Sequence, residues 1–157
     1  LLLQIAVTLH ACGKFISMKN SNECGYTLIM STEIIGLSHL EREIIANVVR
    51  YNIRDFDYDM MQLETEAGQD LAGVSDRTAI TILIAKLTAI LRLANSMDKT
   101  HKSKLIDCRM AVREGQLVIT TGYKGDLALE SASFEQKAAF FEEIFGIRPV
   151  LKQKRRV

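Results

Sequence analysis

The residues near the start of the chain with the clearest chemical potential lie in the stretch VTLHACGKFI, residues 7–16. An apolar helical run leads into His10, and Lys14 follows one turn later on the same helix face. An imidazole beside a carboxylate at such a helix end can share a divalent metal ion. The next residue is Ala11, however, and then Cys12. Three interpretations stay open here: a metal site, a lost metal site, or only the end of a helix.

A polar stripe marks the apolar stretch 76–97, whose periodicity predicts a long central helix. Spacings of three, four and seven residues place these side chains on one side of it: Thr81, Thr88, Arg92, Asn95 and Lys99. Asp98 ends the helix, and His101, Lys102 and Lys104 follow. Guanidinium and ammonium groups suit phosphate oxygens, so Arg92 and Lys99 can hold an anion. The alternative is a solvated stripe with a basic helix end favoured by the helix dipole.

Three other features carry weaker chemical signals. The acidic stretch 55–66 has carboxylates where a calcium loop places ligands, but the position that requires glycine is Met60, which favours an ordinary acidic loop. The basic end, Lys152–Arg156, can touch nucleic acid, although basic termini are usually solvated. Cys12 beside His10 is either an activated thiol or, as we prefer, a small buried side chain.

The composition is that of a globular chain without a bulk charge. The 157 residues are 48% hydrophobic and 25% charged, with a net charge of +1, so any polyanion must be bound by local patches. The three cysteines are far apart, which is typical of reduced thiols in a cytosolic protein. The apolar run 1–9 is too short to cross a bilayer and lacks the basic flank of a signal peptide. We read it as a buried helix that begins before Leu1.

The elements that must position these residues are mainly helical up to about residue 104. Besides the run at the start, we expect helices over residues 24–32, 39–51 and 76–97. Ser38 and Glu41 predict a capping box for the second of these, and Ser75 is expected to cap the third. The polar residues 52–74 read as a loop with one helical turn near Met61.

After residue 104 the periodicity changes to that of strands. β-branched runs on both sides of Glu114-Gly115 predict a hairpin, with the glycine free to take a positive φ. A second capping box from Ser133 to Gln136 predicts a helix over residues 134–145 that ends at Gly146. Residues 148–153 predict a final strand, and 127–131 are ambiguous between strand and helix. We therefore predict a mainly α fold: a helical domain, 1–104, followed by a small α+β subdomain, 105–157.

Several stretches resemble the C-terminal region of the Ppx/GppA phosphatase family, which contains exopolyphosphatases and guanosine pentaphosphate phosphohydrolases. They are LLLQIAVTLHACGKFIS, IMSTEIIGLSHLEREIIANVVRYN and LTAILRLANSMDKTHKSKL, and the tail ALESASFEQKAAFFEEIFG resembles the α+β ending of longer members. The resemblance implies that residues 1–104 form a helical domain related to HD phosphohydrolases. It also implies that the catalytic site belongs to an N-terminal, actin-like pair of domains that this chain lacks.

The resemblance further implies a lost metal site. An HD metal site needs a His-Asp pair, further histidines and a distant Asp. His10 and Asp98 match the first and last positions, but Ala11 replaces the paired Asp and Asn52 stands where a His is common. Two ligands on separate helices cannot satisfy the coordination of a divalent metal. We therefore predict no metal in this chain, and we expect His10 and Asp98 to hydrogen-bond each other and tie two helices together.

The function implied is that of an accessory domain, inactive alone, in an exopolyphosphatase-type phosphohydrolase. It would bind polyphosphate and support a homodimer in the cytoplasm. Mg²⁺ would serve the absent catalytic domains, and we expect no cofactor in this domain. Polyphosphate or guanosine pentaphosphate is the expected partner; nucleic acid and membrane are not expected. The candidates for polyanion binding are Lys14, Arg50, Arg92, Lys99 and Lys102. The alternatives are a non-enzymatic helical dimerisation or signalling module and, less favoured, a self-sufficient HD-type metal phosphohydrolase.

Overall fold

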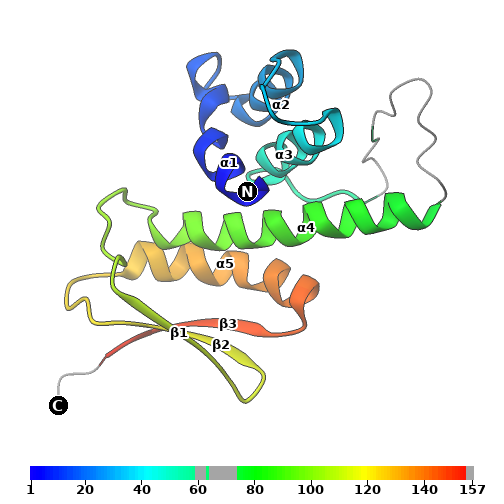
Figure 1. Ribbon diagram of the computed structural model, residues 1–157. Coiled ribbons are helices and arrows are strands. Elements are labelled where there is room, and N and C mark those ends of the chain that lie inside the picture. Colours follow the sequence, from blue (N-terminus) through cyan, green and yellow to red (C-terminus); the bar gives the residue numbers. More distant parts are fainter. Residues whose placement is uncertain (59–62, 64–73, 155–157) are drawn as a thin grey trace. The chain divides into compact units, whose positions relative to one another are not determined.

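A computed structural model describes residues 1–58, 63 and 74–154 of the chain (Figure 1). The chain divides into two compact units, Leu1–Leu91 and Arg92–Val157, which we call unit 1 and unit 2. The division falls within one long helix, α4 (Val74–Met97). The domain boundary expected after residue 104 stays a prediction.

Unit 1 is a helical body with the helix α3 (His39–Tyr51) at the centre of its core. Its further elements are α1 (Leu2–Leu9), the 3-10 helix η1 (Cys12–Phe15) and α2 (Ser21–Ser31). The helix α3 packs against both α1 and α2. It buries Ile44, Ile45, Val48 and Val49, whose spacing places them on one face of the helix. The helices expected at the start and over residues 24–32, 39–51 and 76–97 are thereby confirmed, with small shifts at their ends.

The capping box expected at the start of α3 is present. The Ser38 amide donates to Glu41 Oε2 over 2.8 Å, and the Glu41 amide donates to Ser38 Oγ over 3.2 Å. Each side chain thus satisfies a backbone donor that has no partner within the helix. The cap fixes where α3 begins and so which of its residues enter the core.

The glycine after His10 and Cys12 lies where η1 touches α2. A Cβ atom on Gly13 would lie 1.8 Å from the Ser21 carbonyl oxygen and 2.5 Å from the Gly25 nitrogen. Only a residue without a side chain permits this approach of two backbones. The segment HACGKF therefore follows the end of α1, and its 3-10 turn η1 packs closely on α2 through Gly13.

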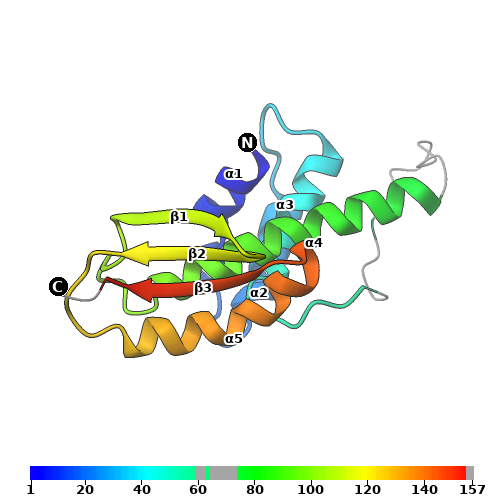
Figure 2. The same cartoon turned by 90° about the horizontal axis from the view of Figure 1, so that it is seen from below.

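Unit 2 contains a small mixed sheet and one crossover helix. After the end of α4 come β1 (Cys108–Arg113), β2 (Gln116–Thr121), α5 (Ala128–Phe145) and β3 (Arg148–Gln153). The strand order is β1-β2-β3, with β1 antiparallel and β3 parallel to β2 (Figure 2). Glu114 and Gly115 both have positive φ, 51° and 74°, as a two-residue hairpin turn of type I′ requires. The predicted hairpin, helix and final strand are confirmed.

Two predicted helix starts are wrong. The helix α5 begins at Ala128, so residues 127–131 lead into a helix and Ser133 lies inside it instead of capping it. The N-cap residue is Leu127, which makes no side-chain capping hydrogen bond. Asp126 before it accepts through Oδ1 a hydrogen bond of 2.8 Å from the Ala128 amide. The helix α4 begins at Val74, one residue before the expected cap Ser75. The predicted turn near Met61 lies outside the described residues.

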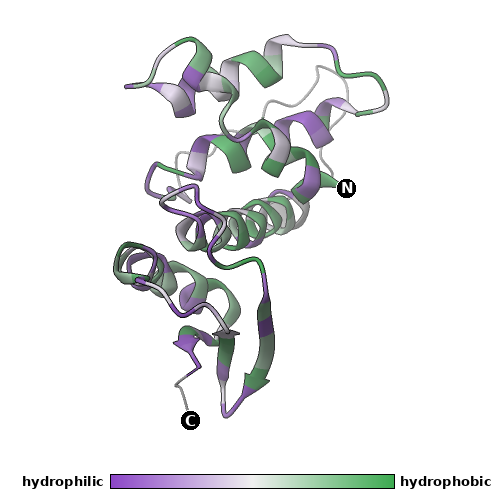
Figure 3. Ribbon diagram, turned by 90° about the vertical axis from the view of Figure 1, so that its left-hand side faces the viewer, coloured by the Kyte–Doolittle hydropathy of each residue, from purple (hydrophilic) through white to green (hydrophobic). Residues whose placement is uncertain are grey.

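The fold class is confirmed: the chain is mostly helical, with a three-stranded sheet near its C-terminus. Hydrophobic and hydrophilic residues occur side by side on its helices and strands (Figure 3). By length and composition alone, one segment within the described residues could span a membrane, Arg77–Met97, with a mean hydropathy of 1.5. The core helix of a soluble protein meets the same criterion, so this result is compatible with the interpretation of α4 as a central helix.

Candidate anion-binding site

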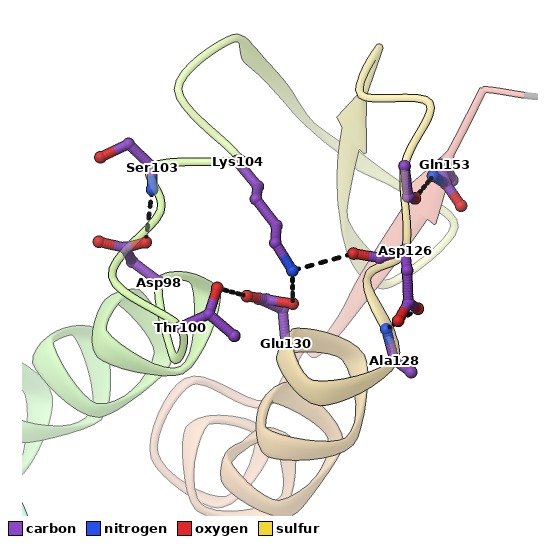
Figure 4. A network of polar contacts seen from close by, with 9 residues as sticks. Asp98, Thr100, Ser103, Lys104, Asp126, Ala128, Glu130 and Gln153 are labelled. Carbon is purple, nitrogen blue, oxygen red and sulfur yellow. Dashed lines mark hydrogen bonds and ion pairs between the residues drawn. The ribbon is translucent and has the colours of Figure 1, made fainter.

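The loop after α4 has a fixed backbone conformation (Figure 4). Asp98 Oδ1 accepts a hydrogen bond of 2.9 Å from the Ser103 amide, and the His101 amide donates to the Asp98 carbonyl oxygen over 3.0 Å. His101 and Ser103 have φ values of 52° and 51°, in the left-handed region that side chains disfavour. The Asp98 contacts stabilise this turn. Asp98 therefore has a structural role at the end of α4.

The same loop is joined to the first turn of α5 through Glu130 (Figure 4). Thr100 Oγ1 donates to one carboxylate oxygen of Glu130, and Lys104 Nζ donates to the other over 3.1 Å. Lys104 also donates to the Asp126 carbonyl oxygen over 3.0 Å. The Thr100 hydrogen bond is the main cause that lowers the pKa of Glu130 to about 2, with Lys104 contributing and burial opposing. Because Lys104 is engaged by Glu130, its charge is already partly compensated.

Four residues of this loop are exposed: Lys99, His101, Lys102 and Ser103. Lys102 lines an open cleft of about 660 Å³, together with Ser103, Lys104, Thr121 and Tyr123. Ammonium and hydroxyl groups can donate hydrogen bonds to phosphate oxygens, while Asp107 at the same cleft bears the opposite charge. The cleft can therefore accept a small anionic group at its Lys102 side.

The predicted pair Arg92 and Lys99 has two different environments. The Arg92 guanidinium lies over the Phe140 ring of α5, with 4.6 Å between its carbon atom and the ring centroid, and the residue is buried. Lys99 is exposed. Arg92 fixes α4 to α5 through this contact, and anion binding by Arg92 and Lys99 stays a prediction.

The other two polyanion candidates belong to unit 1. Arg50 Nε donates to Glu23 Oε1 and Arg50 Nη2 lies against Oε2, both at 2.9 Å, with the guanidinium over the Tyr26 ring. This bidentate contact is the main cause that lowers the pKa of Glu23 and raises that of Arg50. Lys14 is exposed on η1. Lys14 thus offers a solvent-facing charge, whereas the charge of Arg50 is largely compensated by Glu23.

The two positions of the expected lost metal site have local partners. His10 Nδ1 lies 2.6 Å from the Val7 carbonyl oxygen, so this nitrogen donates, because a carbonyl oxygen can only accept. Asp98 binds its own loop, as described above. His10 belongs to unit 1 and Asp98 to unit 2, and their expected hydrogen bond stays a prediction. Among residues 1–58, 63 and 74–154, no three His, Cys, Asp or Glu side chains gather as metal ligands.

Burial raises the pKa of the Cys12 thiol above its ordinary value. A raised pKa leaves less thiolate at neutral pH, and the thiolate is the reactive form. This favours the interpretation of Cys12 as a packed side chain over that of an activated thiol.

The comparison with protein families agrees with the resemblance seen in the sequence. Residues 1–138 match the family profile described as Ppx/GppA phosphatase, domain III. The chain belongs to the Ppx/GppA phosphatase family. The match covers all of unit 1 and continues in unit 2 to Ala138 within α5, so the site around Asp98, Thr100 and Glu130 falls inside domain III. No curated protein matches the chain.

Sequence reasoning missed the residues that hold the loop of domain III in place. Thr100 and Glu130 are 30 positions apart, and no local pattern signals that they meet. A weak signal was available for Glu130, since it is a carboxylate on an otherwise apolar first helical turn, ALE. A carboxylate with 0% of its side chain exposed requires a partner, and here that partner comes from the loop after α4.

Proposed function

We propose that this domain III is an accessory domain of an exopolyphosphatase or guanosine pentaphosphate phosphohydrolase, that it binds phosphate chains, and that it is inactive alone. The observation that carries the proposal is the family match over residues 1–138. In the intact cytoplasmic enzyme, the catalytic groups and a divalent cation would belong to other domains. This domain would hold the substrate chain while its end reacts.

The loop around Lys99 and Lys102 supports phosphate binding. Its backbone is held by Asp98 and its far end by the Lys104–Glu130 contact, so the two exposed ammonium groups extend from an ordered segment. A preorganised loop loses little conformational entropy when an anion binds. Lys14 is a further exposed candidate. Arg50 and Arg92 would contribute only at the expense of their contacts with Glu23 and Phe140.

Calorimetric titration tests this proposal with three ligands: polyphosphate, guanosine pentaphosphate and orthophosphate. We expect micromolar binding of at least one of the first two and much weaker binding of orthophosphate, because each additional phosphate contact adds to affinity. The double variant Lys99→Gln/Lys102→Gln should weaken binding about tenfold. A matched control, Lys19→Gln/Lys86→Gln, removes two exposed charges of unit 1 and should change it little. Equal effects of the two pairs would contradict a local site.

A second part of the proposal is dimer formation, which a group of exposed apolar side chains supports. Phe15, Ile16 and Met18 are 95%, 61% and 77% exposed on and just after η1. Neighbouring exposed apolar side chains are typical of surfaces that contact another protein. Sedimentation velocity should show a dimer of the 17.6 kDa chain, and Phe15→Ser should shift it toward monomer. A monomer at high concentration would contradict this part alone.

A further inference from the structure

One face of the sheet in unit 2 gathers basic side chains from strands far apart in the sequence. Successive side chains of a strand point to opposite faces, so residues aligned across the strands share a face. The register aligns Arg109, Thr120 and Lys152 in one row. Four residues along, it aligns Arg113, Gln116 and Arg148 in another, with Ala111, Val118 and Val150 between the two rows.

This face lies opposite the buried face of the sheet. The alternate residues Ile119, Thr121 and Pro149 are buried on the opposite side of the sheet. In Figure 1 the helix α5 lies along one side of the sheet, and Figure 2 shows the sheet from the other side. Arg109, Arg113 and Lys152 are all exposed. Their side chains are therefore available to a ligand in solution.

The charge on this face is uncompensated at three of its four basic positions. Among the nine aligned positions, four are basic and none is acidic. Arg148 is bound by two carboxylates of α5, Glu142 over 2.9 Å and Glu135. The side chains of Arg109, Arg113 and Lys152, by contrast, make no hydrogen bond or ion pair with any residue that the structure describes. We call these three residues the basic sheet face.

We propose that the basic sheet face is a second binding surface for inorganic polyphosphate, contacting its phosphate oxygens mainly by charge. Neighbouring strands lie about 4.8 Å apart and residues rise about 3.3 Å along a strand. Arg109 and Lys152 are thus about 10 Å apart, and Arg109 and Arg113 about 13 Å. A continuous polyanion can contact all three, whereas one orthophosphate cannot. The inference rests on the proposed function, because it assumes that this domain meets phosphate chains.

The chemistry of the face favours polyphosphate over single-stranded nucleic acid. Proteins that bind single strands combine basic grooves with aromatic side chains on which bases stack. The nine aligned positions carry no aromatic residue. The hydroxyl of Thr120, between Arg109 and Lys152, adds a hydrogen-bond donor that suits a phosphate oxygen.

The charges also argue against a second copy of the chain as the occupant. The strand β1 is an edge strand, and its free edge could pair with another strand. Such pairing between two copies would bring the Arg109 and Arg113 side chains of both copies onto neighbouring strands of one face. Like charges on neighbouring strands oppose pairing.

Calorimetry of the whole chain with long-chain polyphosphate tests the inference through three variants. The first is the triple variant Arg109→Gln/Arg113→Gln/Lys152→Gln. The second, Lys19→Gln/Arg77→Gln/Lys86→Gln, removes the same charge from exposed positions of unit 1. The third is Lys99→Gln/Lys102→Gln. Oligouridylate of matched charge serves as the nucleic-acid ligand, and circular dichroism checks that each variant is folded.

We expect the first variant to weaken polyphosphate binding about tenfold at low salt and to reduce the slope of log K against log salt by about 2. The second should change both values much less. Equal effects of the first two variants would overturn the inference, as would stronger binding of oligouridylate than of polyphosphate by this face. If the third variant alone loses affinity, the inference fails while the proposed function stands. If the wild-type chain binds no polyphosphate, both fail.

Discussion

The Thr100 hydroxyl donates a hydrogen bond to the Glu130 carboxylate and so joins the loop after α4 to the first turn of α5. Lys104 holds the second oxygen of the same carboxylate, and Asp98 holds the middle of the loop. These contacts order the segment that carries Lys99 and Lys102. In this domain III the two groups of residues therefore have separate roles. Asp98 and Lys104 hold the loop, whereas Lys99 and Lys102 face solvent.

The first prediction concerns the pH dependence of the Glu130 contact. A folded-state pKa of about 2, below the ordinary 4.5, means that the ionised carboxylate stabilises the folded state above about pH 4.5. This contribution is lost as the pH falls from about 4.5 toward 2. Urea unfolding should therefore show Glu130→Gln clearly less stable than wild type at pH 6, and the two more nearly equal near pH 2.5.

The exposed Glu33 supplies the control, since Glu33→Gln should leave the unfolding midpoint nearly unchanged at both pH values. A difference between wild type and Glu130→Gln that is constant from pH 6 to pH 2.5 would show that the ionised carboxylate is not what stabilises the loop.

The second prediction concerns the close approach at Gly13. Gly13→Ala would place a methyl group 1.8 Å from the Ser21 carbonyl oxygen, so η1 and α2 must move apart. We expect a loss of about 3 kcal/mol in the free energy of unfolding, measured with urea. Gly122→Ala is the control, because its Cβ would meet nothing within 4 Å, and it should change stability by less than about 0.5 kcal/mol. Equal stabilities of the two variants would disprove the tight contact.

The third prediction contrasts two serines that both precede an apolar helical run. Ser38→Ala removes the cap of α3 and should lower stability by about 1 kcal/mol. Ser133 lies inside α5, so Ser133→Ala should be neutral or stabilising by about 0.5 kcal/mol, because alanine has the higher helix propensity. Thermal unfolding of both variants measures the two changes in stability. If Ser133→Ala lost as much stability as Ser38→Ala, Ser133 would have to act as a helix cap after all.

The fourth prediction uses Glu23 to test Arg50. Glu23→Gln removes the carboxylate that compensates Arg50 and Arg54. The stability should fall by only about 0.5 kcal/mol, because the ion pairs are partly exposed. If Arg50 belongs to the polyanion surface, polyphosphate should bind this variant about threefold more tightly. Unchanged affinity in calorimetry would remove Arg50 from the candidates.

The sequence predicted the elements of the fold well where the signal was local. The Ser38–Glu41 cap, the Glu114-Gly115 turn and Gly146 at the end of α5 each depend on residues next to one another. The start of α5 was mispredicted because Ser133 has a capping pattern, whereas the turn in which Asp126 accepts from the Ala128 amide was not recognised. The mixed sheet agrees with the predicted final strand, but its register was not predictable from single strands.

The candidate site was predictable in kind but not in arrangement. The basic run after Asp98 was visible in the sequence, and the structure shows Lys99 and Lys102 exposed. The contact of Arg50 with Glu23 joins residues 27 positions apart, and that of Arg92 with Phe140 joins different helices. Such contacts depend on tertiary packing, so sequence alone could not distinguish the cations that face solvent from those engaged by a carboxylate or an aromatic ring.

The central claim is that this domain binds phosphate chains through charge. Calorimetric titration with polyphosphate at about 50 mM and 200 mM salt, with metal ions chelated, tests it most directly. We predict measurable binding at the lower salt concentration that falls at least about tenfold at the higher one, through release of counterions. Equal affinities at the two concentrations, or no binding at either, would contradict the claim and leave the domain with a structural or dimerisation role.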